Sequence, residues 1–176
     1  MTQPIVPTAG TAVSVPADQE ALWFLGALSL LRISGAQTRG AFAIAETCAR
    51  HGTGSPVHVH DADDETFLVL DGELRILVGG DEHHAGPGAV AVLPRRVPHA
   101  YVVTSPAARF LVFHTPSGFE EFVRDVGEPA RTLTLPPVAD ARPDVDEVTR
   151  MAAQHGIAIV GPPPVAARLD APRSSS

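Results

Sequence analysis

Three histidines and one glutamate have the residue types and the spacing of a metal site. His58 and His60 are two residues apart, so on a strand both side chains point to the same face. Glu65 follows a polar turn, from which the next strand can return it to that face, and His99 begins a later strand. Three imidazole nitrogens and one carboxylate oxygen suit Fe, Ni, Co, Mn, Cu or Zn and leave one or two positions open. The sequence therefore predicts one divalent transition metal ion per chain, of undetermined identity.

The other polar candidates have simpler explanations. The remaining five histidines are expected in loops, at a helix end or at a strand end: His51, His83, His84, His114 and His155. The pair His83-His84 is placed in a hairpin loop and is weak evidence for a second metal site. Cys48 is interpreted as a small core residue. The sequence leaves open whether His114 or Cys48 faces a pocket.

Short β-strands must position the candidate ligands. Expected strands cover residues 42–46, 57–60, 66–70, 74–78, 89–93 and 110–114, with a further strand beginning at His99. Asp71-Gly72 lies between two such segments and predicts a hairpin turn. The apolar run from Ala21 to Leu31 is interpreted as a buried strand or strand pair. Many short strands at near-regular spacing predict an all-β sandwich or barrel.

The last third of the chain predicts two short helices packed outside the barrel. Ser117-x-x-Glu120 and Asp144-x-x-Glu147 are capping patterns, and Gly127 and Gly156 suit the helix ends. The expected organisation is a flexible arm at 1–20, a β-barrel domain at 21–115, a helical extension at 116–160 and a Pro/Ser-rich tail at 161–176.

Composition excludes several classes of function. Of the 176 residues 44% are apolar, enough for a single core. The net charge of −7 argues against a surface that tracks nucleic-acid phosphates. All 13 basic residues are arginine, so Schiff-base chemistry and a P-loop lysine are excluded. With one cysteine, no intrachain disulfide forms. The run from Ala21 follows Asp18 and Glu20 and is too short to span a bilayer, so we expect a cytoplasmic protein without membrane or nucleic-acid partners.

The frame around the first three candidate ligands matches a known signature. It reads Gly52, five residues, His58-x-His60, four residues, Glu65, six residues, Gly72. This segment resembles the first signature of the cupin superfamily, G(X)5HXH(X)3,4E(X)6G.

A second cupin signature, G(X)5PXG(X)2H(X)3N, is recovered with two departures. Gly88, Pro94 and His99 are in register, whereas Arg96 and Val103 replace the family's glycine and asparagine. The ligand position is kept, so the departures concern the local turn rather than the metal site.

The resemblance implies a single cupin domain, a jelly-roll barrel or double-stranded β-helix with the metal inside. It implies metal ligation by His58, His60, Glu65 and His99. Segments from Pro116 to Pro137 are similar to single-domain actinobacterial cupins often labelled quercetinase-like. Cupins commonly pair through edge strands and arms, so the resemblance also implies a homodimer, with residues 1–16 as such an arm.

Strand alternation from the ligands gives the expected pocket lining. Phe67 and Val69 follow from Glu65, and Tyr101 follows from His99. From the strand before the site, we expect Phe42, Ile44 and Glu46 to face the pocket, or else the residues next to them in the sequence. The expected substrate-binding residues are Phe42, Ile44, Phe67, Val69, Tyr101, Phe110 and Val112. Such a lining suits a flat or medium-sized apolar molecule better than a sugar or a nucleotide.

Three functions remain open. The quercetinase-like resemblance implies a dioxygenase for a flavonol-like, enolic or phenolic aromatic small molecule. Dioxygen would be its second substrate, and Glu65 would serve as ligand and general base. The alternative is a non-redox metalloenzyme, such as an isomerase, epimerase or decarboxylase. The third is a non-catalytic module that binds a small molecule or a metal. Oxygen consumption separates the first from the second, and product formation separates both from the third.

Overall fold

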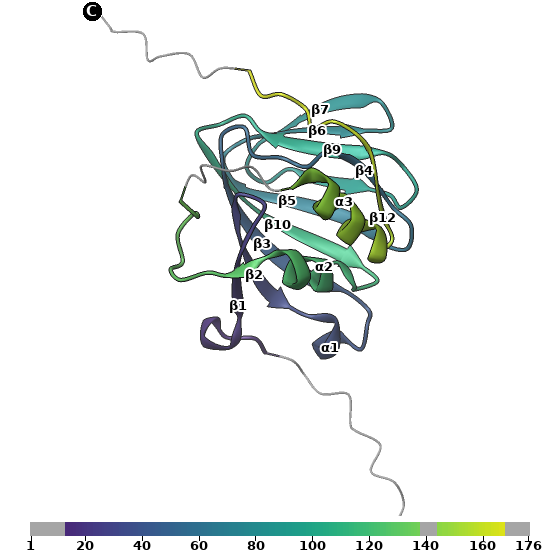
Figure 1. Cartoon of the computed structure of the whole chain (residues 1–176). Coiled ribbons are helices and arrows are strands. Elements are labelled where there is room, and N and C mark those ends of the chain that lie inside the picture. Colours follow the sequence, from purple (N-terminus) through teal and green to yellow (C-terminus); the bar gives the residue numbers. More distant parts are fainter. Residues whose placement is uncertain (1–12, 138–143, 168–176) are drawn as a thin grey trace, which may run out of the picture.

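Two antiparallel β-sheets face each other and enclose the core of the molecule (Figure 1). The computed structural model describes residues 13–137 and 144–167. Three segments lie outside the described residues. They are residues 1–12 of the expected N-terminal arm, residues 138–143 of the expected helical extension and residues 168–176 at the end of the expected tail. The all-β barrel that the sequence predicted is confirmed.

The larger sheet has seven strands in the described part of the chain. Their order across the sheet is β11 (Glu128–Pro129), β1 (Glu20–Phe24), β2 (Ala27–Ile33), β3 (Ala43–Arg50), β10 (Ala107–Thr115), β5 (Asp64–Asp71) and β8 (Val90–Leu93). β1 and β2 form a hairpin, which confirms the strand pair expected in the apolar run.

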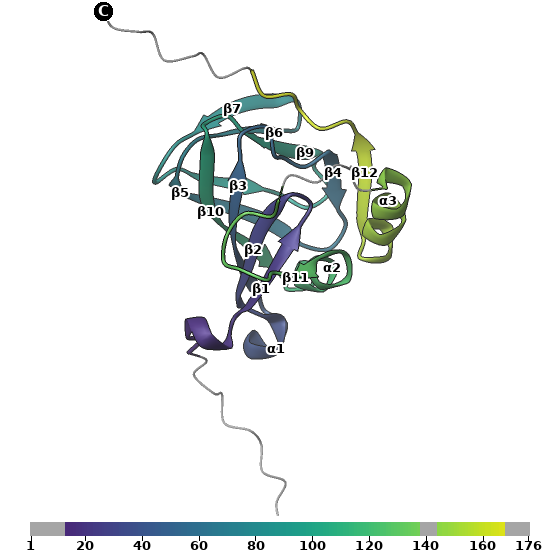
Figure 2. The same ribbon diagram turned by 60° about the vertical axis from the view of Figure 1, so that its left-hand side comes forward.

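The smaller sheet has five described strands and carries three of the four candidate ligands. Their order is β12 (Ile157–Gly161), β4 (Val57–His60), β9 (His99–Val103), β6 (Leu74–Val78) and β7 (Asp81–Ala85). β12 belongs to the predicted helical extension, so that extension also contributes a strand to this sheet. Figure 2 shows β12 beside β4, with α3 outside it.

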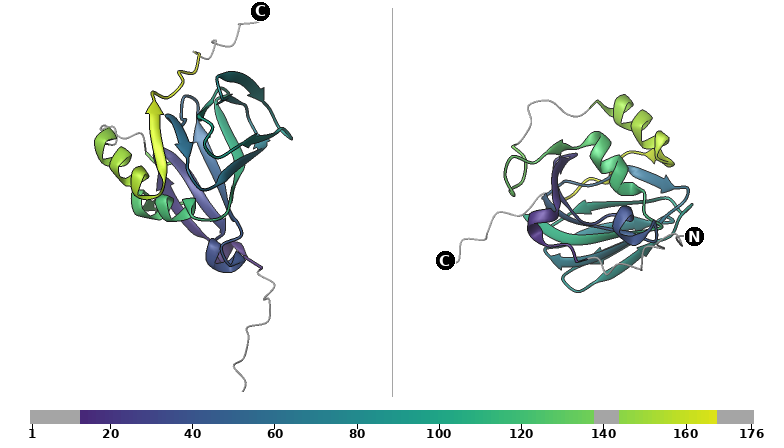
Figure 3. Two further views of the ribbon diagram at one scale, coloured as in Figure 1. Left: turned by 90° about the vertical axis from the view of Figure 1, so that its right-hand side faces the viewer. Right: turned by 90° about the horizontal axis from the view of Figure 1, so that it is seen from below.

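The helices are short and lie outside the barrel. They are the 3-10 turn η1 (Pro16–Asp18), α1 (Gly35–Thr38), α2 (Phe119–Val126) and α3 (Val145–Gln154). α2 and α3 lie side by side on one flank of the barrel, as the two views of Figure 3 show. The two predicted C-terminal helices are thus confirmed. Among the described residues, no helix is long and apolar enough to cross a membrane.

Only one of the two predicted capping patterns is present. The carboxylate of Asp144 accepts hydrogen bonds from the backbone of Asp146 and Glu147, as expected. α2 is different, because its N-cap is Gly118 rather than Ser117. The buried Glu120 carboxylate accepts from the backbone N–H of Gly118 at 2.8 Å and of Gly35 at 2.7 Å. α2 is therefore tied to the start of α1 through this side chain.

Two predictions about turns were wrong. Asp71-Gly72 is not a hairpin, because β5 pairs with β10 and β8 whereas β6 pairs with β7 and β9. The turn instead carries the chain from one sheet to the other. His83 and His84 lie in strand β7, whose hairpin with β6 turns at Gly79-Gly80.

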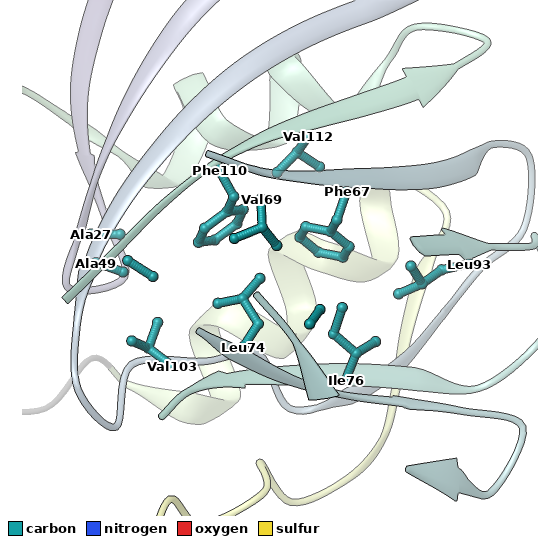
Figure 4. Packing of buried hydrophobic residues seen from close by; sticks show 12 residues of the cluster. Ala27, Ala49, Phe67, Val69, Leu74, Ile76, Leu93, Val103, Phe110 and Val112 are labelled. Carbon is teal, nitrogen blue, oxygen red and sulfur yellow. The ribbon is translucent and has the colours of Figure 1, made fainter. Parts of the chain in front are cut away.

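The core is built where the two sheets face each other (Figure 4). Phe67, Val69 and Phe110 of the larger sheet pack on Leu74 and Ile76 of the smaller one, and all five are at most 1% exposed. Burying each such side chain contributes about 1.5–3 kcal/mol. This packing holds the strands that position the candidate ligands at one end of the cluster.

Candidate metal centre and adjoining cavity

The structure brings the four candidate ligands together inside the barrel. His58 and His60 come from β4, Glu65 from the start of β5 and His99 from the start of β9. His58 and His99 are direct partners across two neighbouring strands. All four side chains are buried, and one potential ligand atom of each lies within 4.8 Å of those of the others.

Hydrogen bonds determine which ring nitrogen of His58 and of His99 is available to a metal ion. Nδ1 of His58 donates to the carbonyl of Pro56, and Nδ1 of His99 donates to the carbonyl of Val97, both at 2.8 Å. A carbonyl oxygen only accepts, so in the neutral ring Nε2 keeps its lone pair for a metal.

Unpartnered buried atoms test whether a cation fits between these residues. Within the described part of the chain, Nε2 of His60, Nε2 of His99 and Oε2 of Glu65 are buried and form no hydrogen bond. Nε2 of His99 and Oε2 of Glu65 lie 3.2 Å apart, but both are acceptors when the ring is neutral. Leaving such groups unsatisfied costs about 1–3 kcal/mol each. A divalent transition metal ion would satisfy all three at once, so this donor set fits the metal that the sequence predicted.

The protonation states of Glu65 and His58 suit a cation, whereas at His60 burial is outweighed by the carboxylates of Asp63 and Glu65, which raise the pKa. Burial raises the pKa of Glu65, but the imidazoles of His99, His114 and His60 outweigh it and hold the pKa at about 2. Burial lowers the pKa of His58 to about 4. An ionised carboxylate and a neutral imidazole are the forms that bind a metal.

Two further residues at the site were not predicted as functional. One carboxylate oxygen of Asp63 accepts from Nδ1 of His114 at 2.6 Å, and the other accepts from Nδ1 of His60 at 3.2 Å. These bonds lower the pKa of Asp63, although burial opposes them. His114 faces the interior, with Nε2 at 3.5 Å from Oε1 of Glu65. His114 pairs with Glu65 across β10 and β5, a register that no local pattern in the sequence indicates.

A mainly apolar cavity of about 100 Å³ adjoins the ligands. Phe67, Tyr101, Phe110 and Val112 line it, whereas Val69 lies in the core cluster and does not. Cys48 is half-buried and is not part of the lining.

The predicted parity of strand β3 was wrong. Ala45 and Thr47 face the cavity, so Phe42 and Ile44 do not line it. Phe42 lies before the strand begins and is 37% exposed. Of the two alternative sets on this strand, the one with Ala45 and Thr47 faces inward.

The C-terminal extension forms part of the cavity wall. Its contribution comes from α2, α3 and β12, through Phe119, Phe122, Val123, Val148, Ala152, Ile157 and Ile159. The Phe119 ring stacks on His114, with 4.1 Å between the ring centroids and 12° between the planes. α2 therefore connects the cavity wall directly to the ligand cluster.

Comparison with known proteins identifies the ligand-bearing region. The family model described as the cupin domain matches residues 46–114, which include all four candidate ligands. This region is a cupin domain. The double-stranded β-helix that the resemblance implied is likewise confirmed.

One curated relative and several solved structures are similar to the chain. Quercetin 2,3-dioxygenase of Bacillus subtilis (strain 168) is 28% identical over 106 residues, which cover 60% of this chain. That match spans about a third of the relative, 32% of its length.

The structural likenesses extend over nearly the whole of smaller cupins. KdgF from Halomonas sp. superposes with a TM-score of 0.56 at 14% identity, covering 64% of this chain and 99% of KdgF. A predicted oxalate decarboxylase from Thermotoga maritima gives 0.53 at 17% identity, covering 60% and 99%. At these identities the likenesses establish the fold of the cupin domain and nothing about its reaction.

Proposed function

We propose that this cupin is a metal-dependent dioxygenase for an enolic or phenolic aromatic small molecule of the flavonol type. His58, His60, Glu65 and His99 would hold one divalent transition metal ion. Glu65 would also be the general base. The sequence similarity to a quercetin 2,3-dioxygenase supports this choice.

The observation that carries the proposal is which ligands face the cavity. Of the four candidate ligands, His58 and Glu65 line it, whereas His60 and His99 are not among the lining residues. A molecule in the cavity therefore meets the carboxylate of Glu65 beside the metal position. A base in that place is suited to a hydroxyl group that the same ion acidifies.

The cavity lining favours a neutral aromatic substrate. Aromatic and aliphatic side chains dominate, and hydroxyl groups come from Ser29, Thr47, Thr53, Ser55 and Tyr101. Among the residues that the structure describes, no arginine lines the cavity, and the whole sequence contains no lysine. A carboxylate or phosphate group would have only the bound metal ion to pair with, whereas a flat phenolic ring would pack against Phe67 and Phe119.

The chain's own residues would act by binding, orienting and moving one proton. A bound redox-active ion of this kind lowers the pKa of a coordinated hydroxyl and activates dioxygen. Glu65 accepts the hydroxyl proton at a carboxylate oxygen, since its low pKa keeps it ionised beforehand. The apolar walls exclude water and orient the ring, which limits side reactions of the resulting anion.

Oxygen uptake with a flavonol such as quercetin tests the proposal. Protein loaded with Mn, Fe, Co or Ni is expected to consume dioxygen and to place both atoms of isotope-labelled dioxygen in the product. Glu65→Gln is expected to lower the rate about 10²–10⁴-fold, since the amide cannot take the proton. A variant rate equal to the wild-type rate at equal metal content contradicts the role of Glu65.

A non-redox isomerase or decarboxylase is the second candidate, because the same carboxylate can move a proton without dioxygen. Turnover of an enolisable substrate at equal rates with and without dioxygen would favour it. The homodimer expected from the resemblance stays a prediction, which light scattering after size-exclusion chromatography measures directly.

A further inference from the structure

We infer that Asp63 is a positioning residue for the metal ligand His60: its carboxylate determines which ring nitrogen His60 presents to the ion. This inference rests on the metal site proposed above. It concerns a residue outside the ligand set, in the turn between β4 and β5.

His60 differs from the other two histidine ligands in what holds its Nδ1. Backbone carbonyls hold Nδ1 of His58 and of His99. In the described structure, Nδ1 of His60 instead contacts the two carboxylate oxygens of Asp63, at 3.2 and 3.1 Å. Because an ionised carboxylate only accepts, the proton of the neutral His60 ring resides on Nδ1 and its Nε2 is free. That Nε2 is the buried atom without a partner that faces the other ligands.

Asp63 is itself held on its other side by His114. The 2.6 Å contact to Nδ1 of His114 is the shorter of its hydrogen bonds. The His114 ring is 2% exposed and lies against Phe119, so this partner has little freedom to move. Because His114 holds the Asp63 carboxylate in place, that carboxylate in turn holds the ring of His60 in one orientation. Outer residues that orient a metal-binding histidine in this way typically change metal affinity about 10–100-fold.

An asparagine at position 63 isolates this role. The amide keeps one acceptor oxygen and replaces the other with an NH₂ group, which donates. The favoured orientation keeps the oxygen on the short contact to His114 and turns the NH₂ group toward His60. The tautomer of His60 with its proton on Nε2 is then favoured, and that proton blocks binding of the metal ion. Asp61→Asn is the matched control, because Asp61 lies in the same turn and is exposed.

Titration with Co²⁺, followed by its visible absorption, measures the effect. We expect the Kd of Asp63→Asn to rise about 10–100-fold and that of Asp61→Asn to stay within about twofold of wild type. Circular dichroism and the melting temperature show whether each variant folds. A folded Asp63→Asn variant that binds Co²⁺ within about twofold of wild type overturns the inference.

The tautomer of His60 provides an independent measurement on the metal-free wild type. Long-range proton–nitrogen NMR, at a pH where the ring is neutral, reports which nitrogen carries the proton. We expect Nδ1–H for His60, and a predominant Nε2–H form overturns the inference even if the variant does not fold. If the wild type binds no Co²⁺ while His60 is in the Nδ1–H form, the metal site fails and the orienting role of Asp63 stands.

Discussion

At Glu65 two requirements meet on one carboxylate: it must face the other ligands and it must face the cavity. Oε2 lies 3.2 Å from Nε2 of His99, on the side of the ligand cluster. The same residue lines the apolar cavity, although it is only 6% exposed. Glu65 is the second residue of strand β5 and pairs with His114 of β10. From this position its carboxylate reaches both the other ligands and the cavity.

Replacing one buried ligand should abolish metal retention and leave the barrel folded. His99→Ala removes an Nε2 from the cluster and a side chain from the edge of the core. We expect the metal content, measured by elemental analysis after dialysis, to fall from about one ion per chain to below about a tenth. Exposed His84→Ala is the control and should keep its metal. Stoichiometric metal in folded His99→Ala would show that the ligand set is wrong.

His58 should make the metal-free protein sensitive to acid. Burial disfavours the charged ring and lowers the pKa of His58 to about 4, from the ordinary histidine value of about 6.5. The unfolded chain therefore binds a proton between these two pH values that the folded chain does not, and stability falls as the pH drops through that window.

The measurement is urea denaturation of metal-free wild type and His58→Leu at several pH values. Leucine does not titrate. Between neutral pH and pH 4, we therefore expect the free energy of unfolding of the wild type to fall by up to about 3 kcal/mol more than that of the variant. Parallel pH profiles for the two proteins would contradict the buried neutral state of His58.

At the scale of elements, the sequence predicted where strands lie better than how they pair or which face they present. His58-x-His60 could be assigned to one face because the strand alternates and the frame around it is distinctive. Residues 42–45 are apolar at every position, so alternation carried no information about which of them faces inward. Asp71-Gly72 specified a turn, but a local signal does not determine whether the next strand pairs with the last one.

Asp63 had no recognisable spacing in the sequence. It lies among three aspartates in one short turn, and two of them, Asp61 and Asp64, point elsewhere. Its role depends on contacts with His60 and with His114, which is 51 residues further along the chain. Such long-range pairing follows from the register of β10 with β5 and cannot be read from a local pattern.

The end of α2 depends on a glycine for a packing reason. Gly127 has an ordinary extended conformation, with φ of −79°, so backbone freedom does not require glycine. A Cβ there would lie 2.5 Å from the carbonyl oxygen of Val123 and 3.3 Å from Cβ of Leu22. Gly127→Ala should therefore lower the free energy of unfolding by about 1–3 kcal/mol.

Gly86→Ala is the matched control for this prediction. Within residues 13–137 and 144–167, no heavy atom lies within 4 Å of the ideal Cβ of Gly86, and its φ is outside the left-handed region. Its stability should stay within about 1 kcal/mol of wild type in the same denaturation experiment. If the two variants are equally stable, the close approach of β1 to the end of α2 does not constrain this position.

At the scale of the whole molecule, the site joins both sheets and the C-terminal extension. β4 and β9 belong to the smaller sheet, β5 and β10 to the larger one, and Phe119 connects α2 to His114. A ligand that binds here is linked to the global folding equilibrium, because the unfolded chain does not assemble the donor set.

Metal should therefore raise the melting temperature. At a free metal concentration 100-fold above the Kd, metal binding raises the free energy of unfolding by about 2.7 kcal/mol. For a chain of this size that corresponds to a rise of about 5–10 °C in scanning calorimetry. His99→Ala should show no comparable shift. A wild-type melting temperature that does not respond to any of the candidate metals would contradict the site.

The most direct test of the central claim is dioxygen consumption by metal-loaded wild type and by Glu65→Gln, with a flavonol as substrate and metal content measured in parallel. We expect metal-dependent uptake of dioxygen in the wild type, matched by loss of the flavonol, and little uptake in Glu65→Gln at equal metal content. Loss of the flavonol at the same rate without dioxygen, or equal uptake by the two proteins, would contradict it.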